Sequence, residues 1–264
     1  MKNILITGAA TGIGLATARL FHARGWSVGL LDIDQVALAE AAMELGDERV
    51  WQRAVDVSDE KAVGAAVEAF AVAHGGQLRC LFNNAGVLAM GRFEELAPEQ
   101  HRRMMMVNVL GVIHCCYAAF PFLRQTPGAY VISMGSASAL YGVPQLASYS
   151  ASKFAVRGLT EALNLEWAEH GITVTDIMPP FVNTGMLRNH PEHPPIVRRM
   201  GVDLAPEQVA VAVWATLDSR RVHRPVGWRF AATFWSEQFL PRALTRAIMA
   251  WLSRPAGRDD GPGP

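Results

Sequence analysis

The chain has 264 residues, and half of them are hydrophobic, which suits one large α/β domain with a sizeable core. Its 24 lysines and arginines balance its 24 aspartates and glutamates, so the composition does not indicate a basic surface for nucleic acid. Three cysteines exclude a disulfide framework and favour a reduced, cytoplasmic setting. The apolar run in residues 1–8 is too short for a signal peptide, and no run of about 18 apolar residues predicts a spanning helix.

The first element is a short apolar run, residues 4–7, which predicts a strand buried on both faces. A glycine-rich stretch follows, Thr7-Gly8-Ala9-Ala10-Thr11-Gly12-Ile13-Gly14, and a helical pattern then continues to Gly25. Glycine lets the backbone approach a pyrophosphate closely, and the helix N-terminus offers free N–H groups. This context predicts a dinucleotide-binding loop, with an ordinary tight turn as the alternative.

A second strand is predicted over residues 26–31, and Asp32 follows it. An acidic residue about 20 positions after the glycine loop fits a hydrogen bond to the adenosine ribose. A carboxylate would also repel a 2′-phosphate, and no basic residue stands at positions 9, 10, 11 or 33. NAD is therefore favoured over NADP. The alternative is a solvated loop aspartate, with Asp34 as a candidate cap for the next helix.

The next elements continue the alternation of helix and strand. Helices are predicted over 35–45 and from a cap at Ser58 to 73, and strands over 50–55 and 78–82. The last of these strands ends in a turn of small residues, Asn83-Asn84-Ala85-Gly86. Ligands of open parallel sheets collect at the carboxyl ends of the strands, so this turn is expected near the nucleotide.

A long helix is predicted from Pro98 to Leu123, with Asn108 in its middle, where asparagine is unfavourable. Surface exposure is the simplest reason for that residue. A strand over 129–134 then leads to Ser136.

Tyr149 and Lys153 lie one turn apart on the next predicted helix, which continues to about His170 and ends at Gly171. A tyrosine has a pKa of about 10, and a fixed positive charge beside it favours the phenolate. The pair therefore suggests a tyrosine adjusted for proton transfer. A sixth strand over 172–177 completes a pattern that predicts a parallel, doubly wound sheet with helices on both faces.

These motifs together resemble the short-chain dehydrogenase/reductase family. The glycine loop matches its T-G-x-x-x-G-x-G pattern, residues 83–86 match its N-N-A-G turn, and Asn108, Ser136, Tyr149 and Lys153 match its catalytic tetrad. The match covers about the first three-quarters of the chain. It implies a Rossmann-like fold of about seven strands and an NAD(P)(H)-dependent oxidoreductase acting on alcohols or ketones. Relatives are commonly homodimers or homotetramers built on the helices that carry Asn108 and Tyr149.

The resemblance also implies roles for single residues. Tyr149 would be the general acid/base, Lys153 would lower its pKa and bind the nicotinamide ribose, Ser136 would bind the substrate oxygen, and Asn108 would hold a water for proton relay. Pro179-Pro180 departs from the usual Pro-Gly, and the second proline fixes φ and removes a backbone N–H from that loop. The expected cofactor contacts are Gly8, Thr11, Gly12, Ile13, Gly14, Asp32, Asp56, Val57, Asn83, Ala85, Gly86, Tyr149, Lys153, Pro179, Val182 and Thr184.

The loops at the same sheet edge are mostly apolar, which suggests an apolar alcohol or ketone, lipid-, steroid- or aromatic-like. The alternative is that these residues merely pack the loops on the body. Residues 190–195, with two histidines among prolines, suggest a mobile lid and fit no metal motif. The candidate substrate residues are Leu88, Met90, Tyr141, Val143, Phe181 and Met186.

Residues 1–227 are assigned to the catalytic domain and 228–264 to a helical extension with a disordered tip. In the extension, apolar residues from 239 to 252 recur at helical spacing, flanked by arginines at 242, 246 and 254. Such a helix is more often packed on the protein or on another subunit than on a membrane, which is the second possibility. A non-catalytic nucleotide-binding sensor or scaffold is the alternative to an enzyme.

Overall fold

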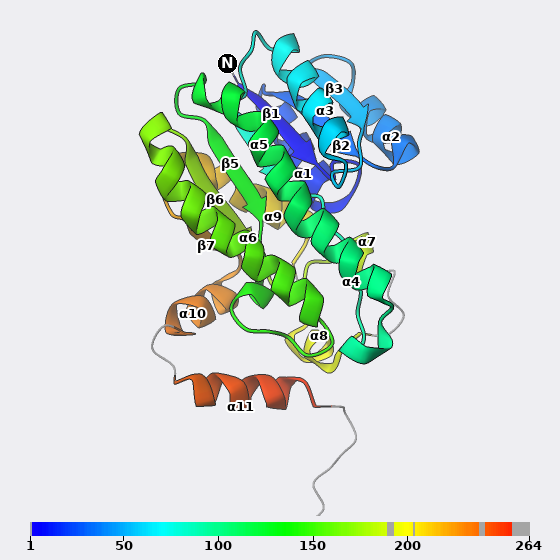
Figure 1. Ribbon diagram of the computed structural model, residues 1–264, viewed down its shortest axis with the longest axis vertical. Coiled ribbons are helices and arrows are strands. Elements are labelled where there is room, and N and C mark those ends of the chain that lie inside the picture. Colours follow the sequence, from blue (N-terminus) through cyan, green and yellow to red (C-terminus); the bar gives the residue numbers. More distant parts are fainter. Residues whose placement is uncertain (1, 189–192, 203, 238–240, 255–264) are drawn as a thin grey trace, which may run out of the picture.

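The computed structural model describes residues 2–188, 193–202, 204–237 and 241–254. A seven-stranded parallel sheet in the order β3-β2-β1-β4-β5-β6-β7 forms its centre, with helices on both faces (Figure 1). This arrangement confirms the predicted Rossmann-like fold. The strands are β1 (Asn3–Thr7), β2 (Ser27–Asp32), β3 (Val50–Ala54), β4 (Cys80–Asn83), β5 (Tyr130–Met134), β6 (Thr173–Met178) and β7 (His223–Pro225).

The helices follow the expected alternation through β6. Short 3₁₀ turns at Phe93–Glu95, Ala137–Ala139, Trp167–His170 and Ala215–Asp218 join or extend them. The α-helices are α1 (Gly12–Ala23), α2 (Gln35–Leu45), α3 (Glu60–Ala73), α4 (Pro98–Met105), α5 (Gly111–Arg124), α6 (Ala147–Glu166), α7 (Gly185–Arg188), α8 (Pro195–Met200), α9 (Pro206–Trp214), α10 (Trp228–Glu237) and α11 (Arg242–Leu252).

Two apolar layers hold the sheet between its helices. On one face, Phe70 of α3 and Leu123 of α5 pack with Leu81 of β4, all of them fully buried. On the other, Phe21 of α1 and Val213 of α9 pack with Ile6 of β1. Strands covered on both faces read as continuous apolar runs, which is why periodicity located them correctly.

Local caps explain where two of the early helices begin. Asp34 accepts hydrogen bonds from the backbone N–H groups of Val36 and Ala37, each at 3.1 Å, as the sequence suggested for α2. The cap predicted at Ser58 is wrong. Asp59 caps α3 instead, while the Ser58 hydroxyl donates to the Asp56 carboxylate at 2.7 Å.

The predicted helix 98–123 is one continuous helical stretch whose middle, Met106–Leu110, is a π-turn. The whole stretch is long and apolar enough to cross a membrane by length and composition, so the expectation that none would qualify is wrong on that test. Its inner face, with Val112, Cys115 and Leu123, belongs to the core on the sheet. Packing in the protein body therefore accounts for the apolar residues of this inner face.

The extension contains two helices that differ in how they contact the body. Phe230 and Phe234 of α10 are buried against Ala139 and Met178, at the carboxyl end of β6. Helix α11 lies beyond α10 at one end of the molecule (Figure 1) and packs on α8. The expected disordered tip, 258–264, and the first half of the expected lid, 190–192, lie outside the described residues.

Candidate functional site

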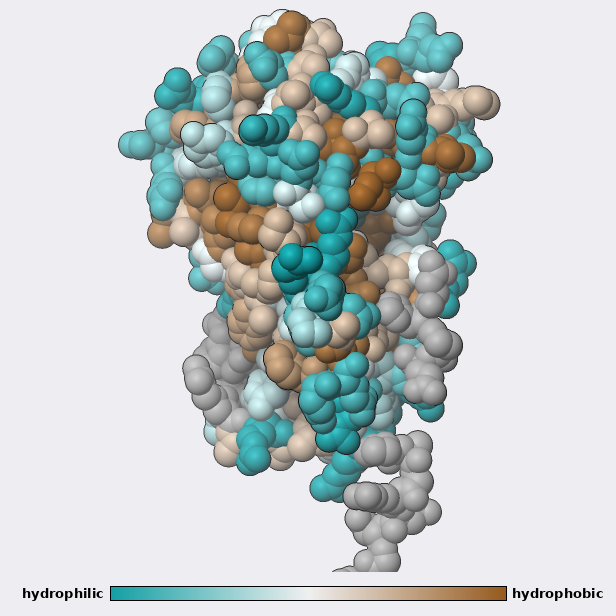
Figure 2. Space-filling view, turned by 45° about the vertical axis from the view of Figure 1, so that its right-hand side comes forward, coloured by the Kyte–Doolittle hydropathy of each residue, from teal (hydrophilic) through white to brown (hydrophobic). Residues whose placement is uncertain are grey.

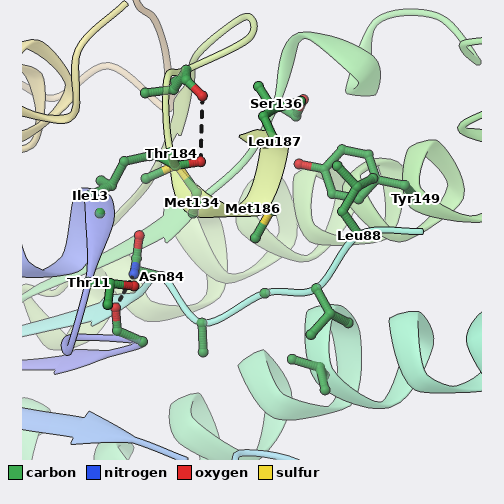
Figure 3. A pocket seen from close by; sticks show the side chains of 18 of the residues that line it. Thr11, Ile13, Asn84, Leu88, Met134, Ser136, Tyr149, Thr184, Met186 and Leu187 are labelled. Atoms are coloured by element: carbon green, nitrogen blue, oxygen red, sulfur yellow. Dashed lines mark hydrogen bonds between the residues drawn. The ribbon is translucent and has the colours of Figure 1, made fainter. Parts of the chain in front are cut away.

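A pocket of about 450 Å³ opens at the carboxyl ends of the central strands, where the glycine loop, the turn after β4 and the loops after β5 and β6 meet (Figure 3). Its size is within the range of small-molecule sites. Most of the expected cofactor contacts line it: Gly8, Thr11, Gly12, Ile13, Asp32, Asp56, Val57, Ala85, Gly86, Tyr149, Lys153, Pro179, Val182 and Thr184.

The glycine loop has the geometry that its glycines allow. Gly8 and Gly12 have φ angles of 63° and 57°, a left-handed conformation that side chains disfavour. A Cβ on Gly14 would lie 2.0 Å from the Gly8 carbonyl oxygen, so only glycine lets α1 begin this close to β1. Gly14 therefore shapes the loop from outside the lining, and the exposed backbone fits a pyrophosphate at the N-terminus of α1.

The two asparagines in the turn after β4 have different hydrogen-bond partners. The side-chain amide of Asn84 donates to the carbonyls of Thr7 and Gly8 at 3.0 and 2.9 Å, which fixes the glycine loop from the pocket side. Asn83, the residue expected in the cleft, is buried outside the lining and points toward Cys116 and Ser133. Because side chains alternate across a strand end, adjacent asparagines face opposite ways.

Asp32 lies at the end of β2 with its carboxylate held by backbone. One oxygen accepts from the N–H of Ala10 at 3.0 Å and the other from that of Asp34 at 3.1 Å. The carboxylate thus joins the glycine loop to the start of α2 at the rim of the pocket. Both carboxylate oxygens are held by backbone N–H groups, so Asp32 differs from the solvated loop aspartate that was the alternative.

One basic residue in the pocket lining was missed. Arg103 of α4 reaches the loop after β3, where its guanidinium pairs with Asp56 at 3.0 Å and donates to Ser58 at 2.9 Å. Burial raises the pKa of Asp56, but hydrogen bonds from Ser58 and Arg103 outweigh it and leave the pKa below its ordinary value. No local signal marks Arg103, since it meets Asp56 only through the packing of α4.

The structure brings Ser136, Tyr149 and Lys153 together at the other end of the pocket, with the Tyr149 hydroxyl turned toward Ser136 (Figure 3). Burial raises the pKa of Tyr149 to about 12, opposed by a hydrogen bond with Ser136. Burial lowers the pKa of Lys153 to about 8, opposed by the charge of Asp176. The ammonium donates to the carbonyl of Met134 at 2.7 Å and lies 5.6 Å from the Tyr149 ring centre.

The pKa of Tyr149 therefore shifts away from the direction expected from the sequence. Helical spacing places an ammonium near the phenol, but desolvation of the phenol, which spacing does not reveal, is the larger effect here.

Asn108 lies in the π-turn and is 1 % exposed, so surface exposure is the wrong explanation for it. Its amide oxygen accepts from the Val87 N–H at 2.8 Å, and its nitrogen donates to the Val87 carbonyl at 2.9 Å and to Ser152 at 3.1 Å. It therefore joins the loop after β4 to Ser152 of α6, and it lies outside the pocket lining. π-turns of this kind often occur at functional sites.

The candidate substrate residues divide into two groups. Leu88, Phe181 and Met186 line the pocket, together with Leu187. Met90 and Val143 lie outside the lining, in an apolar cluster with Ile196 and Val197 of α8. Tyr141 is half-buried and also outside it. Other lining residues that were not foreseen are Ile33, Val55, Val87, Val107, Met134, Gly135, Leu146, Pro180 and Gly185.

Known proteins share this sequence and this fold. Residues 2–195 match the family described as short chain dehydrogenase. A cyclohexanol dehydrogenase of an Acinetobacter species is 34 % identical over 222 residues, covering 80 % of this chain and 86 % of that protein.

Two solved structures of similar fold were determined with cofactors. A short chain dehydrogenase/reductase of Burkholderia phymatum in complex with NAD is 27 % identical, with a TM-score of 0.81 over 98 % of both chains. An alcohol dehydrogenase of Thermococcus sibiricus complexed with 5-hydroxy-NADP is also 27 % identical, with a TM-score of 0.76 over 86 % of this chain and 96 % of that one. The chain belongs to the short-chain dehydrogenase/reductase family.

Proposed function

We propose that this protein is an NAD(H)-dependent oxidoreductase that interconverts an apolar secondary alcohol and its ketone. The observation that carries the proposal is a single pocket with the glycine loop at one end and Ser136, Tyr149 and Lys153 at the other. Cyclohexanol, the substrate in the name of one relative, is such an alcohol.

The glycine loop and Asn84 would hold the dinucleotide, and Thr184 with Val182 would border its nicotinamide end. When bound, the cofactor supplies or accepts the hydride. The chain's own part is proton control. Ser136 would hold the substrate oxygen beside Tyr149. The Tyr149 hydroxyl would give its proton to the forming alkoxide in reduction, and the Tyr149 phenolate would take the alcohol proton in oxidation.

The substrate end of the pocket is apolar. Leu88, Met186 and Leu187 line it around Tyr149 (Figure 3), and they offer no side-chain donor or acceptor for a second polar group. Turnover of secondary alcohols should therefore favour cyclohexanol-like substrates over polyols. A panel of both kinds, assayed for NADH formation, tests this. Tight NADH binding with no turnover of any alcohol would instead favour the non-catalytic sensor.

The preference for NAD is proposed from Asp32, whose fixed carboxylate would accept from a ribose hydroxyl and repel a 2′-phosphate. Replacing Asp32 with asparagine keeps the shape and removes the charge. We expect the ratio of kcat/KM with NAD to that with NADP to fall about tenfold or more, equivalent to about 1.4 kcal/mol.

Asp34→Asn is the matched control for this measurement. It removes a neighbouring charge outside the pocket lining, and asparagine caps α2 as well as aspartate does. If both variants change the ratio equally, the ratio depends on the net charge of the region. The proposed contact of Asp32 with the adenosine ribose would then be wrong.

A homodimer or homotetramer is proposed from the outer faces of the long helices. Apolar side chains gather across the middle of one face of the molecule (Figure 2). On α5, Ile113 and Tyr117 are 39 % and 79 % exposed, and on α6 Phe154 is 42 % exposed. Contiguous exposed apolar surface of this kind is typical of subunit interfaces.

A second candidate function is a dehydrogenase that works on a lipid surface, and α11 favours it. Met249 and Leu252 pack on the apolar cluster beside the substrate end, while Leu244, Ile248 and Trp251 are 47 %, 42 % and 58 % exposed. Residues 242–254 contain three arginines and no acidic residue. An exposed apolar stripe on a basic helix fits an anionic membrane.

Co-sedimentation with phosphatidylglycerol vesicles tests this candidate. The double substitution Leu244→Gln/Ile248→Gln should lower the bound fraction several-fold, because each apolar side chain contributes about 1.5–3 kcal/mol when fully buried. Met43→Gln/Val72→Gln, at exposed positions on α2 and α3, is the control. Equal sedimentation of all three proteins would exclude a membrane role for α11.

A further inference from the structure

A row of polar side chains crosses the sheet next to the loop after β5, which contains Gly135 and Ser136. Asn83, Ser133, Asp176 and His223 are register partners on β4, β5, β6 and β7. Register partners in a sheet point to the same face, and here it is the face covered by α5 and α6. Asp176 is 0 % exposed, so its carboxylate needs partners to remain charged.

His223 is one such partner. Its Nδ1 lies 3.1 and 3.0 Å from the two carboxylate oxygens of Asp176, and its Nε2 lies 3.0 Å from Glu161 of α6. Glu161 also accepts from Arg157 at 3.0 Å. Helix α10 contributes the uncharged ring of Phe234 to this site. Burial lowers the pKa of His223, but hydrogen bonds and charge from Asp176 outweigh it and leave the pKa raised.

The other side of Asp176 faces the loop after β5. A Cβ on Gly135 would lie 3.6 Å from the carboxyl carbon of Asp176, and Gly135 is the residue between Met134 and Ser136. The Met134 carbonyl accepts the hydrogen bond from Lys153 at 2.7 Å. Asp176 thus lies behind the backbone that holds Lys153, and its charge acts on that ammonium.

We propose that Asp176 is a positioning residue shared between two cations: its charge keeps Lys153 protonated for proton transfer, while His223 competes for it and joins it to Glu161 at the surface. The proposal rests on the function proposed above. The groups that set the balance are Lys153, Arg157 and Glu161 on α6, Asp176 on β6 and His223 on β7. Lys153 stays an ammonium up to higher pH when Asp176 is ionised.

The chain contains three lysines, at positions 2, 61 and 153, which makes direct NMR titration of ¹³C-labelled lysine practical. The Lys153 signal, assigned with Lys153→Arg, should titrate near pH 8. Asp176→Asn, which keeps the shape and the acceptor for His223, should lower that midpoint by about one pH unit. Asp176→Thr, suited to a strand, should shift it in the same direction if the asparagine variant does not fold.

His223→Gln tests whether a shift of the Lys153 midpoint comes from the charge of Asp176 or from disruption of the contacts around it. It removes the competing cation, so the Lys153 midpoint should stay the same or rise. His170→Gln, at the opposite end of α6 from Tyr149, should leave it unchanged. An unchanged midpoint in the Asp176 variants, or an equal fall in His223→Gln, would overturn the proposal.

Enzyme assays give a second reading of the same shift. The alkaline limb of the kcat/KM profile should move to lower pH in Asp176→Asn by the same amount as the NMR midpoint, with kcat at pH 6 retained. An equal loss of kcat/KM at every pH would mean that Asp176 only stabilises the packing of β7 against β6. Wild type that turns over no alcohol would remove the proposed function, while the NMR titration would still test the link between Asp176 and Lys153.

Discussion

Replacing Tyr149 with phenylalanine is expected to lower kcat for alcohol oxidation by about 10²–10⁴-fold, the usual share of general acid–base catalysis. The half-buried ring stays in the pocket lining and only the hydroxyl beside Ser136 is lost. NADH formation from the best alcohol of the panel is the measurement. Ketone reduction should fall to a similar extent, because the same hydroxyl would act as acid in that direction.

The pH dependence of the wild type is expected to test the same assignment. With burial raising its pKa to about 12, Tyr149 is protonated at neutral pH and ready to act as an acid. Oxidation needs the phenolate, so its rate should rise with pH until Lys153, with a pKa of about 8, begins to lose its charge. Reduction should fall only as the pH approaches 12, because the phenol stays protonated below that pH.

Two controls make the Tyr149 result interpretable. Tyr117→Phe removes the hydroxyl of a tyrosine that is 79 % exposed on α5, and kcat should not change. NADH affinity of Tyr149→Phe, measured by fluorescence titration, should stay within a few-fold of wild type. Full activity in Tyr149→Phe would show that another group transfers the proton.

The fold could be predicted because its signals are local. Buried parallel strands are continuous apolar runs, and glycines and aspartates mark the ends of the helices, as with Gly171 after α6 and Asp34 before α2. The order of the strands, β3-β2-β1-β4-β5-β6-β7, was not predicted, because it depends on pairing between distant segments. The π-turn at Asn108 carries no such signal, because one extra residue in a helical turn leaves the apolar pattern nearly unchanged.

Within the site, the sequence predicted the pocket residues that lie at fixed positions relative to the strand ends. It missed the residues that reach the site only because distant elements pack together. The glycine loop, Ser136 and Tyr149 follow from their positions relative to strand ends. Arg103 reaches the pocket only because α4 packs over the loop after β3, and Asp176 meets His223 only through strand pairing 47 residues apart. The charge that acts on Lys153 thus comes from a residue that no motif indicates.

Gly14→Ala is expected to have the second large effect, because the new Cβ would lie 2.0 Å from the Gly8 carbonyl oxygen and 2.8 Å from the Asn84 amide nitrogen. Backbone cannot yield by that distance without moving the loop. Forcing a methyl group into packed surroundings costs about 1–3 kcal/mol of folding stability. NADH affinity should fall about tenfold or more, since the N–H groups at the start of α1 would no longer meet the pyrophosphate.

Gly64→Ala is the matched control, also within a helix, with nothing within 4 Å of the added Cβ. It should stabilise the protein by about 0.5–1 kcal/mol, as expected when alanine replaces glycine in a helix, and leave NADH affinity unchanged. Thermal unfolding and fluorescence titration of both variants give the two readings. If Gly14→Ala binds NADH as tightly as wild type, the contact between α1 and β1 is looser than the structure has it, and the loop does not depend on glycine there. Weak NADH binding in Gly14→Ala alone would instead show that the approach of α1 to Gly8 is what forms the cofactor site.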